Sequence, residues 1–124
     1  MSRLFLIIGS INAMLAIMLG AFGAHALKTR LSNELVNVFQ TAVQYHFYHA
    51  LGLLVIGLVA LQIPSSALLK WSGGVMLTGM LIFSGSLYLL AVTNIRWLGA
   101  ITPVGGVAFI IAWGLFTFTI YKEL

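Results

Sequence analysis

The side chains with the widest chemical range lie in one short run, Gln44-Tyr45-His46-Phe47-Tyr48-His49. Its two imidazoles could bind a metal or carry a proton, and its amide and phenols can form hydrogen bonds. The sequence then stays apolar as far as Gln62, so these polar groups must be accommodated in apolar surroundings. Together with one upstream histidine, they give the candidate functional polar cluster: His25, Gln44, Tyr45, His46 and His49.

A metal site is one chemistry that these histidines could support. His46 and His49 are three residues apart, so they share one face of a helix, and imidazole is a common ligand for zinc and copper. A third ligand is needed, however, and His25 is expected to point away from the small-residue face of its helix. The chain has no aspartate or cysteine, and both glutamates fall outside the expected spans. We therefore predict no metal and no cofactor, and keep a histidine-based metal-binding accessory as the second alternative function.

Transport is the first alternative function. Ionisable side chains inside a membrane are costly and usually serve a function, which favours an oligomeric transporter or channel-like protein that uses the histidines. Histidine can also stay neutral there and simply form hydrogen bonds. A hydrolytic enzyme is disfavoured, because the chain has no Gly-x-Ser-x-Gly motif and no intramembrane carboxylate to orient a histidine. We predict no catalytic residue and no enzymatic activity.

The composition indicates that lipid surrounds most of the chain. Of its 124 residues, 61% are hydrophobic and only 6% are charged, whereas soluble domains carry about 25% charged residues. The net charge of +4 suits anionic lipid headgroups. No basic patch is dense enough to predict nucleic-acid binding. The expected partners are the lipid bilayer and either further copies of the chain or another membrane protein.

The spacing of the charges predicts four membrane spans. Consecutive charged sites leave uncharged intervals of 24, 35, 25 and 25 residues, and one helical span needs about 20 apolar residues. Backbone groups in lipid must be paired internally, which favours helices. The predicted fold is an all-α integral membrane four-helix bundle forming one domain over residues 1–124. Its helices are expected at about 4–26, 33–62, 66–92 and 103–121.

Periodicity predicts which way the central polar run faces. Leu35, Phe39 and Ala42 lie on one face of the second helix, and His46 and His49 continue that face, so both histidines should point into the bundle. A helix of 30 residues is about 45 Å long, which exceeds the ~30 Å thickness of the hydrocarbon core. We expect the excess length at the amphipathic start of this helix, with the span beginning near Ala42. Tyr45 and Tyr48 would then lie near the membrane interface, where such rings anchor helices.

Short polar residues mark the expected helix starts. Ser32 and a serine at the 63–66 turn are expected N-caps, and Thr102-Pro103 reads as an N-cap followed by proline at the first helical position.

Small residues mark expected helix contacts, because they let backbones approach closely in lipid. Asn12, beside such a stripe, should form an interhelical hydrogen bond. The third helix has two small-residue faces and is expected at the centre: one face has Gly74, Thr78 and Gly85, and the other has Ser72, Gly79 and Ser86. The principal packing glycines are Gly20, Gly23, Gly85, Gly105 and Gly106.

The ends of the chain leave two questions of topology. Ala24-His25-Ala26 resembles a signal-peptide cleavage site, but the apolar segment before it is too long and three more spans follow, so we expect a retained helix. Four spans put both termini on one side. Basic residues divide three against three between the two sides. Because Glu34 partly offsets Lys28 and Arg30, we predict that both termini are cytoplasmic.

Each expected helix also carries one recognisable motif. The motifs are Gly20-Ala21-Phe22-Gly23-Ala24-His25-Ala26-Leu27, then Gln44-Tyr45 with His49-Ala50-Leu51, then Phe83-Ser84-Gly85-Ser86-Leu87-Tyr88, then Thr102-Pro103-Val104-Gly105-Gly106 followed by Trp113. In this order they resemble a family of small bacterial inner-membrane proteins of unknown function typified by YgdD and YwdK. The resemblance implies four spans and an inner-membrane location, maps the family's histidines to His25 and His49, and leaves His46 as an addition. It supplies no established activity and no catalytic residue.

These observations favour a non-enzymatic membrane component. We expect a small multi-pass protein that packs with a protein or lipid partner.

Overall fold

A computed structural model describes the whole chain, residues 1–124, and consists of helices and short connections. Four of its helices are long and apolar enough to cross a membrane. They begin and end within a few residues of the predicted positions, so the all-α, four-span fold is confirmed. The elements are α1 (Ser2–Phe22) with a π-helical extension η1 (Gly23–Leu27), α2 (Asn33–Ala60), α3 (Ala67–Thr93), a 3₁₀ helix η2 (Arg96–Ala100) and α4 (Thr102–Glu123).

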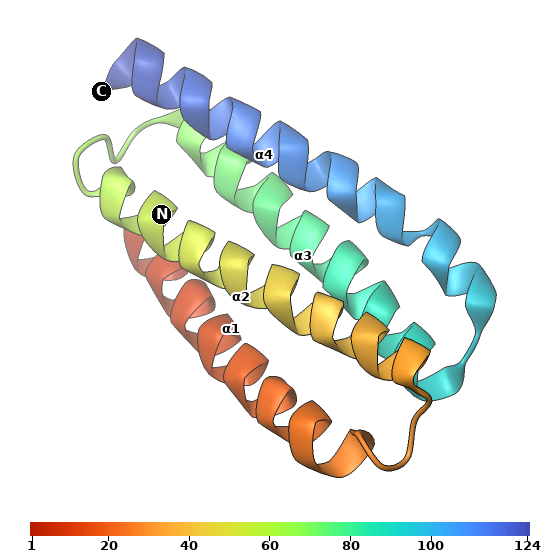
Figure 1. Ribbon diagram of the computed structural model, residues 1–124. Helices are drawn as coiled ribbons and strands as arrows, with labels where there is room; N and C mark the ends of the chain where they lie inside the picture. Colours follow the sequence, from red (N-terminus) through yellow and green to blue (C-terminus); the bar gives the residue numbers. More distant parts are fainter.

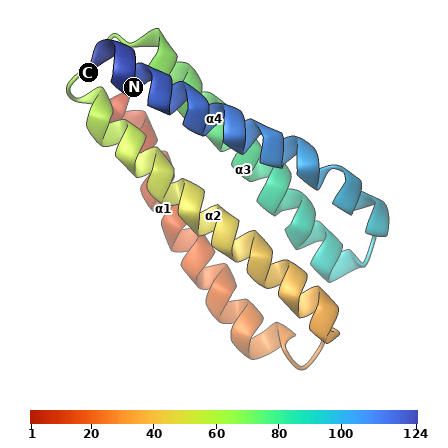
Figure 2. The same ribbon diagram turned by 45° about the horizontal axis from the view of Figure 1, so that its top comes forward.

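The four long helices run up and down, and each packs against the helix that follows it in the sequence. Figures 1 and 2 show α2 and α3 between α1 and α4, with the N- and C-termini at the same end of the molecule. We call this the terminal end; it also carries the α2–α3 turn. The opposite end, which carries residues 28–32 and 94–101, is the loop end. The expected central position is thus shared by α2 and α3.

The largest core cluster joins all four helices near the terminal end. Leu53 and Ile56 of α2, Met76 and Met80 of α3 and Phe109 of α4 are buried there. Phe5 of α1 joins the cluster and lies against Gly73 of α3. In lipid, close packing of this kind replaces the hydrophobic drive that joins helices in water.

Two of the three predicted helix caps are confirmed. The Ser32 hydroxyl accepts a hydrogen bond from Leu35 N at the start of α2, and Ser66 accepts one from Leu69 N at the start of α3. The prediction for α4 is wrong: Thr102 is itself helical and caps nothing. Because η2 runs almost directly into α4, the Thr102 hydroxyl bonds back to the Leu98 carbonyl and lies 2.6 Å from Ser86 Oγ.

The predicted packing glycines differ in how closely they meet a neighbour. A Cβ at Gly105 would lie 2.5–2.8 Å from the Phe83 backbone and Cβ, and one at Gly23 would lie 2.7 Å from the Phe39 ring. A Cβ at Gly20 would lie 3.2 Å from Val43. Gly106 has only ordinary contacts, with Phe83 atoms 3.8 Å from such a Cβ.

The prediction that Gly85 packs against a neighbouring helix of the chain is wrong, since a Cβ there would meet nothing within 4 Å. Gly85 and Gly74 belong to the same predicted small-residue face of α3, and Gly74 is open as well. The other predicted face is the one that packs. Its Ser72 hydroxyl bonds the Ala112 carbonyl of α4 at 2.8 Å, and Gly79 lies against Phe109.

Candidate functional site

The run at residues 44–49 divides between the inside and the outside of the bundle. His46 and His49 are 7% and 5% exposed, as the periodicity predicts. They follow Leu35 and Phe39 on the buried face of α2. Gln44 and Tyr48 point outward and are exposed, whereas Tyr45 is 37% exposed and its ring packs against Phe83 of α3. The candidate cluster is therefore two sites: a buried histidine pair and an exposed polar surface.

His46 joins three helices through its two ring nitrogens. Its Nε2 lies 2.9 Å from the Asn12 Oδ1 of α1, and its Nδ1 lies 2.9 Å from the Tyr88 hydroxyl of α3. The Asn12 amide nitrogen donates to the Ile8 carbonyl, so its oxygen faces the histidine and can only accept. His46 therefore carries its proton on Nε2, and Tyr88 donates to Nδ1. The predicted interhelical hydrogen bond of Asn12 is confirmed.

His49 joins α2 to α4. Its Nδ1 donates to the Tyr45 carbonyl at 2.7 Å, and its Nε2 accepts from the Trp113 indole N–H at 3.1 Å. Its ring stacks on Phe109 with 3.5 Å between centroids and 6° between planes. An indole nitrogen can only donate, which places the single imidazole proton on Nδ1. Both nitrogens of both buried histidines are thus occupied by uncharged partners.

The three histidines do not converge. His25 lies in the π-helical turn η1, is exposed, and belongs to neither buried network. No three side chains of the His, Cys, Asp and Glu types come close enough together to hold a metal ion. In addition, each lone pair of His46 and His49 that could reach a metal already accepts a hydrogen bond. This geometry does not favour the histidine-based metal-binding alternative.

Two partners of the histidines, Tyr88 and Trp113, are not predicted by the sequence analysis, in which they occur only as members of motifs. A signal for Trp113 was present, because a tryptophan in the middle of a span, far from the interface, still needs an acceptor for its indole N–H. Serines of α3 add further bonds between helices, such as Ser84 to the Ala42 carbonyl of α2 at 2.8 Å.

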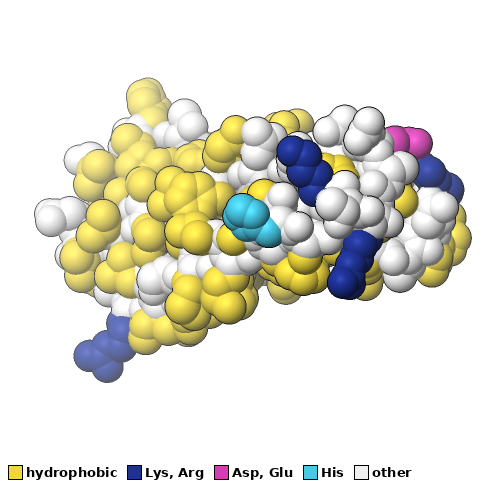
Figure 3. Space-filling model, turned by 60° about the horizontal axis from the view of Figure 1, so that its bottom comes forward, with side chains coloured by type: hydrophobic (Ala, Val, Ile, Leu, Met, Phe, Trp, Pro, Cys, Tyr) yellow, Lys and Arg dark blue, Asp and Glu magenta, His cyan; other side chains and the backbone are white.

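The charged residues bound a wide uncharged belt. At the loop end Glu34 pairs with Arg96, and at the terminal end Gly57 lies against Leu6, which puts Arg3 level with Ala60. From Glu34 to Ala60, α2 rises about 39 Å, more than the ~30 Å hydrocarbon core. Figure 3 shows basic side chains toward the two ends of the elongated molecule and hydrophobic side chains over much of the rest.

The exposed polar surface lies near the middle of this belt. On α2, the midpoint of the uncharged belt is Phe47. Along the helix axis, Gln44 therefore lies about 5 Å and Gln40 about 10 Å from the midplane of the belt. The expectations that the span begins near Ala42 and that Tyr45 and Tyr48 lie near the interface stay predictions, because a belt longer than the ~30 Å core can shift along the membrane normal.

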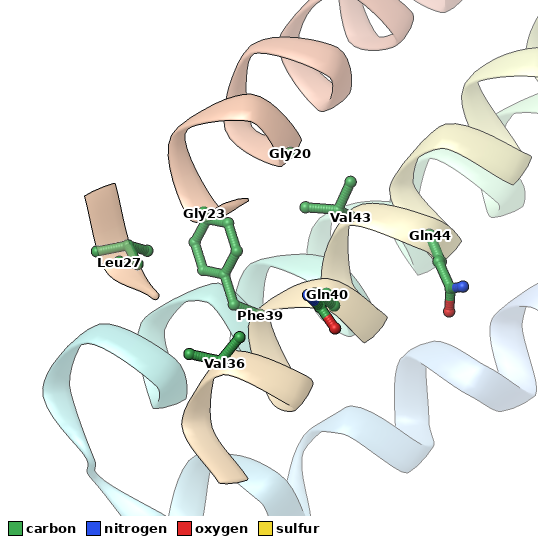
Figure 4. Close-up of a pocket in the computed structure, with 8 residues that line it drawn as sticks. All are labelled: Gly20, Gly23, Leu27, Val36, Phe39, Gln40, Val43 and Gln44. Carbon is green, nitrogen blue, oxygen red and sulfur yellow. The ribbon is translucent and has the colours of Figure 1, made fainter. Parts of the chain in front are cut away.

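Two hollows flank Gln44 between α1 and α2. One, of about 270 Å³, reaches toward the loop end, and one, of about 380 Å³, reaches toward Tyr48. Figure 4 shows the first hollow, with Phe39 directed at Gly23 and the Gln40 and Gln44 side chains projecting from α2. The hollows share three lining residues: Gly20, Val43 and Gln44.

Comparison with known proteins identifies the family. Residues 19–106 match a family described as "Protein of unknown function (DUF423)". The chain belongs to this family. It is 48% identical to the UPF0382 membrane protein YwdK of Bacillus subtilis (strain 168), over 98% of this chain and 99% of that protein. It is 50% identical to a UPF0382 membrane protein of Staphylococcus epidermidis (strain ATCC 12228 / FDA PCI 1200), over 90% of this chain and 89% of the relative. No solved structure matches the chain.

The family assignment confirms the resemblance drawn from the four motifs. Its relatives are named as membrane proteins, which agrees with the four candidate spans. The chain is therefore a small multi-pass membrane protein.

Proposed function

We propose that this chain is a non-enzymatic component of the bacterial inner membrane, a small bundle that binds another membrane component through its surface. One observation carries the proposal: the ring nitrogens of His46 and His49 are all occupied by neutral partners, three of them from α1, α3 and α4 and the fourth the Tyr45 carbonyl of α2 itself. Neither histidine lines the two hollows beside α2, so neither presents a ring nitrogen to a ligand there. The histidines serve to join helices.

The proposed location and orientation rest on separate observations. The relatives are named membrane proteins, which supports residence in a membrane, and we propose that this is the inner (plasma) membrane. Both termini lie at one end of the molecule, which supports their being on one side, and we propose the cytoplasmic side.

Proton transport is the second candidate, favoured by the row of hydrogen bonds Asn12–His46–Tyr88 across three helices. Flux measurements in proteoliposomes separate the two functions. For a membrane component, an imposed pH gradient decays at the rate of empty vesicles. For a transporter, it decays faster with the native chain, and His46→Gln removes the excess. The second result would replace our proposal.

A further inference from the structure

The outward face of α2 carries amide groups that nothing in the chain satisfies. Within α2, the side chains that form hydrogen bonds are Glu34, Thr41, His46 and His49. Gln40 and Gln44 are exposed and form none. They lie one helical turn apart, so their side chains form a row on one face, which Tyr48 continues with 51% of its side chain exposed. We call Gln40, Gln44 and Tyr48 the outward row.

The outward row lies deep in the uncharged belt, where an amide without a hydrogen-bond partner is costly. Gln44 is about 5 Å from the midplane of the uncharged belt, so it stays inside a ~30 Å core even if the molecule shifts by a helical turn along the membrane normal. Acyl chains offer no donor or acceptor, and a polar group left unpaired in hydrocarbon is costly. The row therefore requires a partner that brings both donors and acceptors to the middle of the membrane.

We propose that the partner is a second copy of this chain, joined through the outward row. A carboxamide has two donor hydrogens and an acceptor oxygen, so it is its own complement. Copies that insert in the same orientation can be related by a two-fold axis along the membrane normal, which sets Gln44 opposite Gln44 at equal depth. No charged side chain lies in the row to repel its counterpart.

The surroundings of the row suit close approach of another helix. Ala16 and Gly20 of α1 line the hollows beside Gln44, and such small residues allow backbones to come near each other. The hollow of about 380 Å³ next to Phe47 and Tyr48 leaves room for side chains of the second copy. The inference deepens the proposed function by naming its partner, and it rests on that function only for residence in the membrane.

The chain contains no cysteine, so single-cysteine variants give a clean test. Tyr48→Cys, which keeps both amides of the row, should form a disulfide-linked dimer in native membranes under mild oxidation. Leu81→Cys is the matched control: it is 65% exposed on α3, and the Ser84–Ala42 bond puts it within about one helical turn of the depth of Tyr48. Little dimer is expected from this control. Equal cross-linking of the two variants, or cross-linking of Tyr48→Cys to a different protein, would overturn the proposal.

A second measurement tests for the dimer without cross-linking. Photobleaching steps of the labelled chain in liposomes should reveal dimers, and the Gln40→Leu/Gln44→Leu variant should dimerise about tenfold more weakly. In detergent dilute enough to keep both proteins monomeric, the variant should keep the native melting temperature, because neither amide forms a hydrogen bond within the chain. Single steps for the native chain, or unchanged dimers in the variant, contradict the inference. The flux assay is independent, so failure of either proposal can be recognised separately.

Discussion

His46 and His49 lie one helical turn apart, yet their partners require opposite tautomers. The Asn12 oxygen fixes the proton of His46 on Nε2, and the Trp113 N–H fixes that of His49 on Nδ1. The Tyr88 hydroxyl can rotate from donor to acceptor, but the indole cannot accept. A second proton on His49 would therefore set two donors against each other, which makes His49 the more firmly neutral of the pair.

The Trp113–His49 bond gives a prediction at this scale. Trp113→Phe keeps an aromatic ring but removes the donor, leaving His49 Nε2 buried without a partner, so the free energy of unfolding should fall by about 1–3 kcal/mol. Trp71→Phe is the control, because Trp71 is 67% exposed and forms no side-chain hydrogen bond. Thermal unfolding in detergent followed by circular dichroism measures both. Equal melting temperatures for the two variants would show that the bond contributes nothing.

Single residues differ in how far their sequence reveals them. The inward direction of both histidines could be predicted, because it follows from periodicity within one helix, and so could the hydrogen bonding of Asn12. The identity of the partners could not. Whether Trp113 meets His49 depends on the axial register between α2 and α4, and periodicity within a helix does not determine that register. The same limit hid the bond from Ser84 to Ala42.

At the scale of the helices, α3 shows what small residues can and cannot predict. They indicate where a backbone can be approached, but not which of two small-residue faces is used. The face with Ser72 and Gly79 packs on α4, while the face with Gly74 and Gly85 is open. Helix ends were better predicted, because charges and capping serines mark them locally. Only Thr102 misled, because the 3₁₀ turn before it depends on tertiary structure.

Paired glycine substitutions test this assignment. Gly105→Ala places a methyl group against the Phe83 backbone, so α3 and α4 must separate, and overpacking of this kind typically costs about 1–3 kcal/mol. Gly85→Ala meets nothing and should leave stability unchanged or raise it by up to about 1 kcal/mol through better helix propensity. Thermal unfolding of both variants in the same detergent provides the comparison. A larger loss for Gly85→Ala would reverse the assignment of the two faces.

At the scale of the whole molecule, the number of spans could be predicted from charge spacing alone, whereas the side of the membrane could not. Three basic residues lie at each end, so the usual bias of Lys and Arg is absent. The position of Gln44 within the uncharged belt was also out of reach, because it depends on how Arg3 of α1 and Arg96 of η2 align with α2.

Cysteine labelling tests the orientation without changing any charge. If both termini are cytoplasmic, Thr29→Cys at the loop end should react with a membrane-impermeant maleimide on intact cells. Ser65→Cys in the α2–α3 turn should react only after lysis. Both positions are exposed. The opposite pattern would place the termini outside the cell, and labelling of both variants on intact cells would indicate mixed insertion.

The order of the helices in space has a consequence for how this protein is made. Because each long helix packs on its successor, α1 and α2 can associate as a hairpin while the ribosome is still translating α3. The second hairpin then needs only to dock on α2. Contacts between elements close in sequence favour rapid assembly, so biogenesis requires no search by a late segment for an early one across the bilayer.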